Sequence, residues 1–178
     1  RWGRRGGTEQ ARLSDLDITE RNAIDISANQ SPGKQATMVT TRTAKEVDAP
    51  GLLVLFQQLG YSVDLDNLQS SLREYNPCRY ALIAEVKERL SGVIVVNLIE
   101  PMHEKGRWGL ISALVIDESC RGMGVGRILL AEAERIAAAS GCSQIELSSS
   151  ERREQAHKFY QNNGYKEVRK RFLKSLIS

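Results

Sequence analysis

Three glycines at alternate positions, Gly122, Gly124 and Gly126, stand between a strand-like and a helix-like segment. Residues 108–117 are rich in β-branched and aliphatic side chains, and apolar residues from 128 to 137 recur with helical spacing. Glycines let the backbone take positive φ, so that successive N–H groups can point into one concavity. Because the loop also begins a helix, the positive end of the helix dipole adds to the attraction for anions. The pattern predicts a strand–loop–helix unit that binds a phosphate or pyrophosphate.

The rest of the chain predicts further strands and helices in mixed order. Helical spacing is found over residues 45–59, 64–75 and 152–162, and strand-like runs over residues 80–86, 92–98, 143–149 and 165–173. The polar run Lys87, Glu88 and Arg89 suits the turn of an antiparallel hairpin. The predicted order is helix, helix, three strands, helix, strand, helix, strand. This order indicates an α/β (α+β mixed) fold with helices packed on a central sheet.

The length and the distribution of residue types predict one domain and a tail. A chain of 178 residues accommodates one ordinary domain. Residues 1–37 are rich in Gly, Ser, Asn, Gln and Thr and show no sustained period, so we expect a flexible N-terminal extension. Residues 38–178 form the predicted domain.

Several classes of protein are disfavoured by composition. No apolar run approaches the roughly 18 residues of a membrane-spanning helix. The three cysteines lack CxxC spacing, which argues against a disulfide framework and a metal site. A formal charge of +3 without a basic stripe argues against nucleic-acid binding. We therefore expect a cytoplasmic protein without a metal, a membrane partner or a nucleic-acid partner.

The glycine loop does not fit the two best-known nucleotide loops. The G-x-G-x-x-G pattern fails at Arg127 or at Leu129, and the Walker pattern lacks its G-K-[ST] ending. The loop does match R-x-x-G-x-G through Arg121, Gly124 and Gly126. Downstream, an A-x-x-F-Y-x-x-x-G-[FY] pattern is filled by Ala156, Phe159, Tyr160, Gly164 and Tyr165. With both patterns in order, the chain resembles the GNAT superfamily of N-acetyltransferases over roughly residues 38–173.

The resemblance implies acetyl-CoA as the co-substrate. In the family, this loop holds the pyrophosphate of coenzyme A, which assigns that role to Arg121, Gly122, Met123, Gly124, Val125, Gly126 and Arg127. The family's preceding strand, here Leu114, Val115 and Ile116, binds the pantetheine arm and polarises the thioester carbonyl through main-chain hydrogen bonds. That role requires a strand that is locally splayed or bulged.

The resemblance also suggests catalytic groups. Tyr160 lies where the family often has the general acid that protonates the coenzyme A thiolate. Ser112 stands where several relatives have a glutamate base, so no base is assigned. Glu100, His103 and Glu104 are candidates close by in the sequence, and a neutral amine or a water chain would make a dedicated base unnecessary. Arg153 replaces an asparagine that contacts the coenzyme in many relatives.

The function implied by the resemblance is transfer of an acetyl group to a primary amine. The leading interpretation is a small-molecule amine. The alternatives are a protein lysine or N-terminal acetyltransferase, and a non-catalytic acetyl-CoA-binding module. Dimers are common in the family, so a homodimer is a further open expectation.

Overall fold

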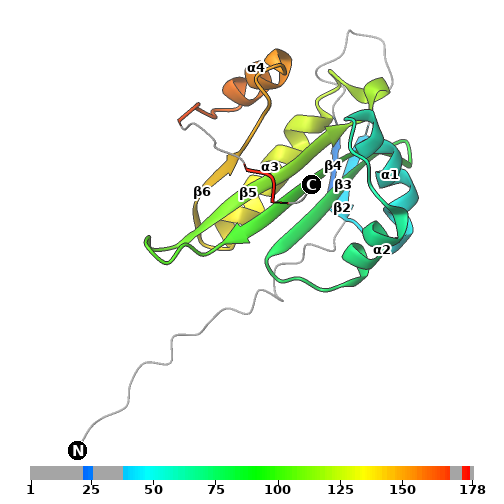
Figure 1. Cartoon of the computed structure of the whole chain (residues 1–178). Coiled ribbons are helices and arrows are strands. Elements are labelled where there is room, and N and C mark those ends of the chain that lie inside the picture. Colours follow the sequence, from blue (N-terminus) through cyan, green and yellow to red (C-terminus); the bar gives the residue numbers. More distant parts are fainter. Residues whose placement is uncertain (1–21, 26–37, 169–173, 177–178) are drawn as a thin grey trace, which may run out of the picture.

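One sheet organises the molecule in the computed structural model, which describes residues 22–25, 38–168 and 174–176 (Figure 1). Its strand order is the chain order, and the strands are β1 (Asn22–Asp25), β2 (Met38–Thr43), β3 (Arg79–Val86), β4 (Arg89–Ile99), β5 (Arg107–Ile116) and β6 (Cys142–Leu147). Neighbouring strands are antiparallel up to β5, and β6 alone runs parallel to its neighbour β5. The parallel pair follows from the crossover helix that joins β5 to β6.

Helices pack on both faces of this sheet. They are η3 (Glu46–Asp48), α1 (Ala49–Gln58), α2 (Leu65–Arg73), η4 (Glu118–Cys120), α3 (Val125–Ala139) and α4 (Glu154–Asn162), where η3 and η4 are single 3₁₀ turns. In Figure 1, α1 and α2 lie together near β2 and β3, whereas α3 lies behind β4 and β5. Within the described ranges, no helix has the length and apolar content needed to cross a bilayer.

Two apolar cores explain the almost unbroken aliphatic run of β4. Ile94 belongs to the core under α3, together with Leu129 and Ile136, and each of the three side chains is fully buried. Val93, the preceding residue, belongs to the core under α1, together with Leu55. Successive side chains of a strand point to opposite faces, so a strand covered on both faces is apolar at every position.

The turns and helix ends follow the sequence signals. Asp64 caps α2 by accepting a hydrogen bond from the amide of Asn67 at 2.9 Å. Lys87 and Glu88 have φ of 50° and 61° and form the tight turn of the β3–β4 hairpin. Gly164, with φ of 87°, ends α4. These positions confirm the predicted hairpin and helix boundaries.

The predicted fold class is confirmed, but the inventory of strands needs correction. Residues 38–43 form β2, which the sequence analysis did not predict because alternate threonines conceal its buried face: Val39 and Thr41 are 0% and 3% exposed. Residues 22–25 form β1, although they lie within the predicted extension. Of the predicted last strand, residues 165–168 are not a strand, and residues 169–173 lie outside the described residues. The domain boundary at residue 38 stays a prediction.

A half-buried ion network joins β2 to the start of the first helical segment. The guanidinium of Arg42 contacts Asp48 at 2.7 Å and Glu85 at 2.7 Å. Burial alone would raise the pKa of Asp48, but hydrogen bonds from Arg42 and from the Lys45 amide hold this pKa below its usual value. The network therefore links β2, η3 and β3 and keeps the Asp48 carboxylate ionised.

Replacing Arg42 by Met should lower the free energy of unfolding by about 3 kcal/mol, because two poorly hydrated carboxylates lose their shared cation. The difference from wild type should shrink as the pH falls through the acidic range, where burial lets Asp48 take up a proton in the variant while Arg42 keeps it ionised in the wild type. Denaturant unfolding at several pH values measures both effects. Arg152→Met, at an exposed position, is the control and should change stability by less than about 0.5 kcal/mol. Equal effects of the two substitutions would contradict the assignment.

Candidate active site

The glycine loop begins α3 with a left-handed backbone. Gly124 is the residue that caps α3 and has φ of 90°, and Gly122 has φ of 77°. In the described part of the chain, no backbone acceptor is found for the amides of Gly122, Gly124, Val125 and Gly126. These N–H groups and the positive end of the α3 dipole make the loop a site for an anion.

The loop is held in place by buried side chains on either side of its glycines. Val125 is 1% exposed and lies in the core under α3, against which Met123 also packs. A Cβ added to Gly126 would lie 3.4 Å from the ring of Phe159 and 3.5 Å from Ile116. These distances are ordinary van der Waals contacts, so α3, α4 and the end of β5 meet at this residue.

Positive charge at the loop comes from two exposed arginines. Arg121 has a side chain that is 52% exposed and lies 3.6 Å from the exposed carboxylate of Glu118. A pair of this kind is weak in water and leaves the guanidinium able to contact another anion. Arg127 is exposed on the first turn of α3. The predicted anion-binding residues therefore do come together at one end of β5.

The strand that leads to this loop separates from its neighbour. Pairing of β5 with β6 ends at Ile111 and Leu147. At the same point, the register of β5 against β4 shifts, since Val95 lies opposite Ala113 and Val96 lies opposite Ile111. Ser112 is the extra residue, which makes a β-bulge. The splayed or bulged strand that the predicted role required is thus present, two residues before Leu114.

The separated part of β5 has an open edge. The amide N–H of Asp117 donates a hydrogen bond to the carbonyl of Ser91 on β4. Because the main-chain N–H and C=O groups of alternate residues face the same neighbouring strand, those of Val115 also face β4. The N–H and C=O groups of Leu114 and Ile116 then face the side from which β6 has departed. An extended ligand lying there could pair with both residues as an added strand.

Tyr160 lies in an aromatic group on α4 and the segment after it. Its ring centroid is 5.3 Å from that of Phe159 and 5.8 Å from that of Tyr165. Since the Phe159 ring lies 3.4 Å from where a Cβ of residue 126 would stand, this group lies beside the glycine loop. Burial raises the pKa of Tyr160, and the nearby charge of Arg153 opposes this effect. The phenol is therefore protonated at neutral pH, as a proton donor must be.

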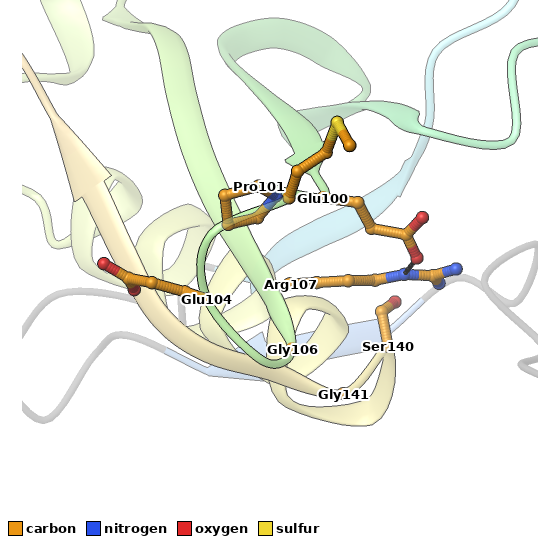
Figure 2. A pocket seen from close by; sticks show the side chains of 8 residues that line it. Glu100, Pro101, Glu104, Gly106, Arg107, Ser140 and Gly141 are labelled. Atoms are coloured by element: carbon orange, nitrogen blue, oxygen red, sulfur yellow. Dashed lines mark hydrogen bonds and ion pairs between the residues drawn. The ribbon is translucent and has the colours of Figure 1, made fainter.

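The three candidate bases lie at the other end of β5. Glu100, Glu104 and Arg107 line an open hollow of about 530 Å³ between the β4–β5 loop and the turn after α3 (Figure 2). Glu100 accepts a hydrogen bond from Arg107 at 2.6 Å, and His103 packs edge-on against Trp108 at 6.1 Å. The ten residues of β5 span about 30 Å. This hollow and the anion loop are therefore separate, and these side chains are remote from the open edge.

The bulged residue has a polar neighbour that the sequence analysis did not single out. Ser112 is exposed, and its hydroxyl accepts a hydrogen bond from the side-chain amide of Asn97 at 2.9 Å. Asn97 interrupts the apolar run of β4, and a polar residue in such a run was the signal in the sequence that could have indicated a functional position. The two side chains lie on the face of the sheet that carries α1 and α2.

Comparison with known proteins decides the family. Residues 49–165 match the model of the acetyltransferase (GNAT) family. The chain is also 33% identical over 137 residues, or 77% of its length and 88% of the relative's, to aminoalkylphosphonate N-acetyltransferase from Salmonella typhimurium. The chain belongs to the GNAT acetyltransferase family.

Solved structures agree on the GNAT fold. An aminoglycoside acetyltransferase from an uncultured soil metagenomic sample, crystallised with sisomicin, gives a TM-score of 0.67 at 18% identity, covering 78% of this chain and 97% of that one. Glucosamine-6-phosphate N-acetyltransferase from Arabidopsis thaliana gives a TM-score of 0.68 at 18% identity, covering 78% of this chain and 99% of that one. At these identities the likeness describes the fold alone.

Members of the GNAT family use acetyl-CoA, and the residues of this chain fit such a co-substrate. The loop offers amides without backbone acceptors, two arginines stand beside it, and the open edge of β5 adjoins it. Among the described residues, no group of three or more His, Cys, Asp and Glu side chains could hold a metal ion. The N-acetyltransferase prediction is confirmed at the level of the enzyme class.

The raised pKa of Tyr160 is open to direct measurement. Because burial disfavours the phenolate, Tyr160 should ionise above the ordinary value of about 10. Near-ultraviolet absorbance titration of the wild type, with that of Tyr160→Phe subtracted, isolates this residue. An ionisation midpoint at or below the ordinary value would contradict the described environment.

Proposed function

We propose that this GNAT enzyme transfers the acetyl group of acetyl-CoA to the primary amine of a small molecule, with the co-substrate bound between the glycine loop and the open edge of β5. The observation that carries the proposal is the continuity of these two features at one end of β5. Acetyl-CoA would supply the activated acetyl group and, through its pyrophosphate, the anion that the loop is built to hold.

The glycine loop would bind the pyrophosphate through its main-chain amides more than through its side chains. The amides of Gly122, Gly124, Val125 and Gly126 have no backbone acceptor in the described part of the chain and would donate to the anion. Arg121 and Arg127 would supply charge from the exposed side. Met123 and Val125 anchor the loop to the core. This division of roles accounts for every residue in the predicted anion-binding set.

The open edge of β5 would hold the arm of the co-substrate. The main-chain groups of Leu114 and Ile116 pair with it, and Val115 keeps the strand fixed through its side chain, which is 1% exposed on the opposite face. A main-chain N–H at this edge can also stabilise negative charge on a carbonyl oxygen. The three strand residues then have distinct roles, although their side chains are all aliphatic.

Tyr160 would deliver the proton that the departing thiolate requires. It lies on α4 beside the loop, is half-buried, and keeps its proton at neutral pH because burial raises its pKa. Proton transfer from a positioned side chain typically contributes about 10²- to 10⁴-fold in rate. The position of Arg153 near Tyr160 places a positive charge where a phenolate would form transiently.

The choice of a small-molecule acceptor is supported by the curated relative, which is named for aminoalkylphosphonates. An amine of that class carries an anionic group at a short distance from its nitrogen. We also keep the cytoplasmic location as a prediction. A homodimer is a further prediction.

A thiol-release assay with acetyl-CoA and a panel of primary amines tests the proposal. Turnover of a small amine by the wild type, reduced at least about 100-fold in Tyr160→Phe, is the expected result. Binding of coenzyme A without turnover of any amine would contradict the enzymatic role. Turnover of peptide amines in place of small ones would contradict the acceptor class.

The two ends of α3 provide a matched test of the anion loop. Gly122 and Gly141 both have φ of 77°, and a Cβ at either position would meet nothing within 4 Å. Alanine at each position should cost similar backbone strain, about 1–2 kcal/mol. Only Gly122→Ala should weaken coenzyme A binding, by about tenfold, in calorimetric titration. Equal affinities of the two variants would count against the loop as the pyrophosphate site.

A further inference from the structure

Gln58, the last residue of α1, joins this helix to the segment that leads into the glycine loop. Its side-chain nitrogen donates a hydrogen bond to the carboxylate of Asp117 at 3.0 Å, and its side-chain oxygen accepts one from the main-chain N–H of Glu118 at 3.3 Å. A carboxylate only accepts and a main-chain N–H only donates, so a side-chain amide is the group that serves both. We call these two hydrogen bonds the Gln58 bridge.

Both ends of the Gln58 bridge rest on one apolar core. Leu55, one turn before Gln58 on α1, is 2% exposed and lies in the core under α1, against which Leu59 also packs. Val115, two residues before Asp117, is 1% exposed and lies in the same core. The side chain of Gln58 therefore starts from one fixed point and reaches a second fixed point at the end of β5.

The carboxylate of Asp117 is the anionic partner in the Gln58 bridge. It also accepts hydrogen bonds from the main-chain N–H of Ser119 at 3.0 Å and from the hydroxyl of the same residue. The hydrogen bonds from Ser119 and Gln58 lower the pKa of Asp117, and the positive charge of Arg89 acts in the same direction. At neutral pH the Gln58 nitrogen thus donates to a charged acceptor, which makes this hydrogen bond stronger than one between neutral groups.

Successive turns carry the position of the Gln58 bridge into the loop. The N–H of Cys120 donates to the carbonyl of Asp117 at 2.9 Å. The N–H of Arg121 donates to the carbonyl of Glu118 at 3.4 Å. The N–H of Met123 then donates to the carbonyl of Cys120 at 3.3 Å, which closes a turn over the first glycine of the loop. A displacement of the Glu118 peptide would therefore move the amides and the arginine that the proposed function assigns to the pyrophosphate.

The Gln58 bridge anchors the loop from the second face of the sheet. Met123 and Val125 hold the end of the loop that enters α3, through the core on the α3 face. Gln58 holds the end that leaves β5, from the α1 face. Apolar packing and a polar bridge thus fix opposite ends of one short segment.

We infer that Gln58 is a positioning residue for the co-substrate, because its bridge to Asp117 and Glu118 holds the glycine loop in the arrangement that binds the pyrophosphate of coenzyme A. The inference rests on the proposed function and deepens it: part of the affinity for coenzyme A comes from α1, a helix that contributes no residue to the loop or to the open edge of β5. Gln58 acts through the main chain and needs no contact with the coenzyme.

Calorimetric titration with coenzyme A tests the Gln58 bridge by a matched pair of substitutions. Gln58→Ala removes both hydrogen bonds and should weaken coenzyme A binding by about tenfold. Gln57→Ala, at the exposed neighbouring position on the same helix, is the control and should bind coenzyme A like the wild type. Urea unfolding of both variants without coenzyme A, at the temperature of the titration, shows that each is folded.

Gln58→Glu makes the affinity depend on pH. The substitution keeps the size of the side chain but puts a second carboxylate against Asp117, and two such groups share a proton with a raised pKa. At about pH 8 the two charges repel, and coenzyme A should bind at least about tenfold more weakly than to the wild type. At about pH 5.5 the shared proton restores a donor, so the ratio of the two affinities should recover to within about threefold.

The other charges near the Gln58 bridge do not produce this recovery. Among the described residues they are Arg89 on β4 and the pair formed by Glu118 and Arg121, which the wild type and the variant share. The helix itself adds none, since Ala49–Gln58 contains no titratable side chain. The titration of coenzyme A also cancels in the ratio, because both proteins bind the same ligand at each pH.

A double variant tests the direction of the hydrogen bond. In Asp117→Asn, an amide nitrogen replaces the acceptor that faces the Gln58 nitrogen, so two donors meet and coenzyme A affinity should fall by about tenfold. Adding Gln58→Glu exchanges the roles, because the introduced amide donates, and the introduced carboxylate accepts from it and from the N–H of Glu118. The double variant should therefore bind coenzyme A within about threefold of the wild type at about pH 8.

The outcomes separate this inference from the proposed function. A wild type that does not bind coenzyme A would overturn both. A wild type that binds it, with equal affinities of Gln58→Ala and Gln57→Ala, would overturn the inference alone. So would folded variants whose losses neither recover at the lower pH nor are reversed in the double variant, because a general structural defect depends on neither the proton nor the exchange of donor and acceptor.

Discussion

The parting of β5 from β6 is the constraint on which the rest of the site depends. Up to Ile111 and Leu147 the two strands pair. Beyond them β5 continues without β6 for five residues toward the glycine loop, from Ser112 to Ile116, and stays paired with β4. Unpaired main-chain groups are unfavourable unless water or a ligand satisfies them. β5 stays paired with β4 on both sides of Ser112, and the bulge at Ser112 shifts the register of that pairing. An extended ligand at the open edge and an anion at the loop can therefore be held next to each other.

Helix α3 makes this arrangement rigid. Its buried face, with Leu129, Leu130 and Ile136, fills the core beneath β4 and β5, and the same helix presents its N-terminus at the end of β5. The loop cannot shift without disturbing that core, because Val125 is itself buried. The anion site is thus positioned by apolar packing, and its chemistry comes from the backbone. The residues just before the loop, Leu114 and Ile116, can therefore be aliphatic, because their side chains pack and their main-chain groups bind.

The sequence predicted local features well and long-range ones poorly. The glycine loop, α3 and the β3–β4 hairpin have signals within a few residues, and each lies where it was expected. Strand β2 was missed because its buried positions include Thr41, whose burial depends on pairing with a strand some forty residues later. The candidate bases Glu100, His103 and Glu104 are near Ser112 in the sequence, but the extended residues at the start of β5 separate them from it in space. The place where β5 and β6 separate depends on the parallel pairing of two strands that a helix keeps apart in the sequence, which no local pattern discloses.

The central claim is that coenzyme A lies along the open edge of β5 with its pyrophosphate on the glycine loop. Amide hydrogen exchange, measured with and without coenzyme A, tests this claim most directly. The account predicts slower exchange at the amides of residues 122–126 and at Leu114 and Ile116, with little change at residues 100–107 and 140–141 around the remote hollow. Protection confined to that hollow, with none at the loop, would contradict it.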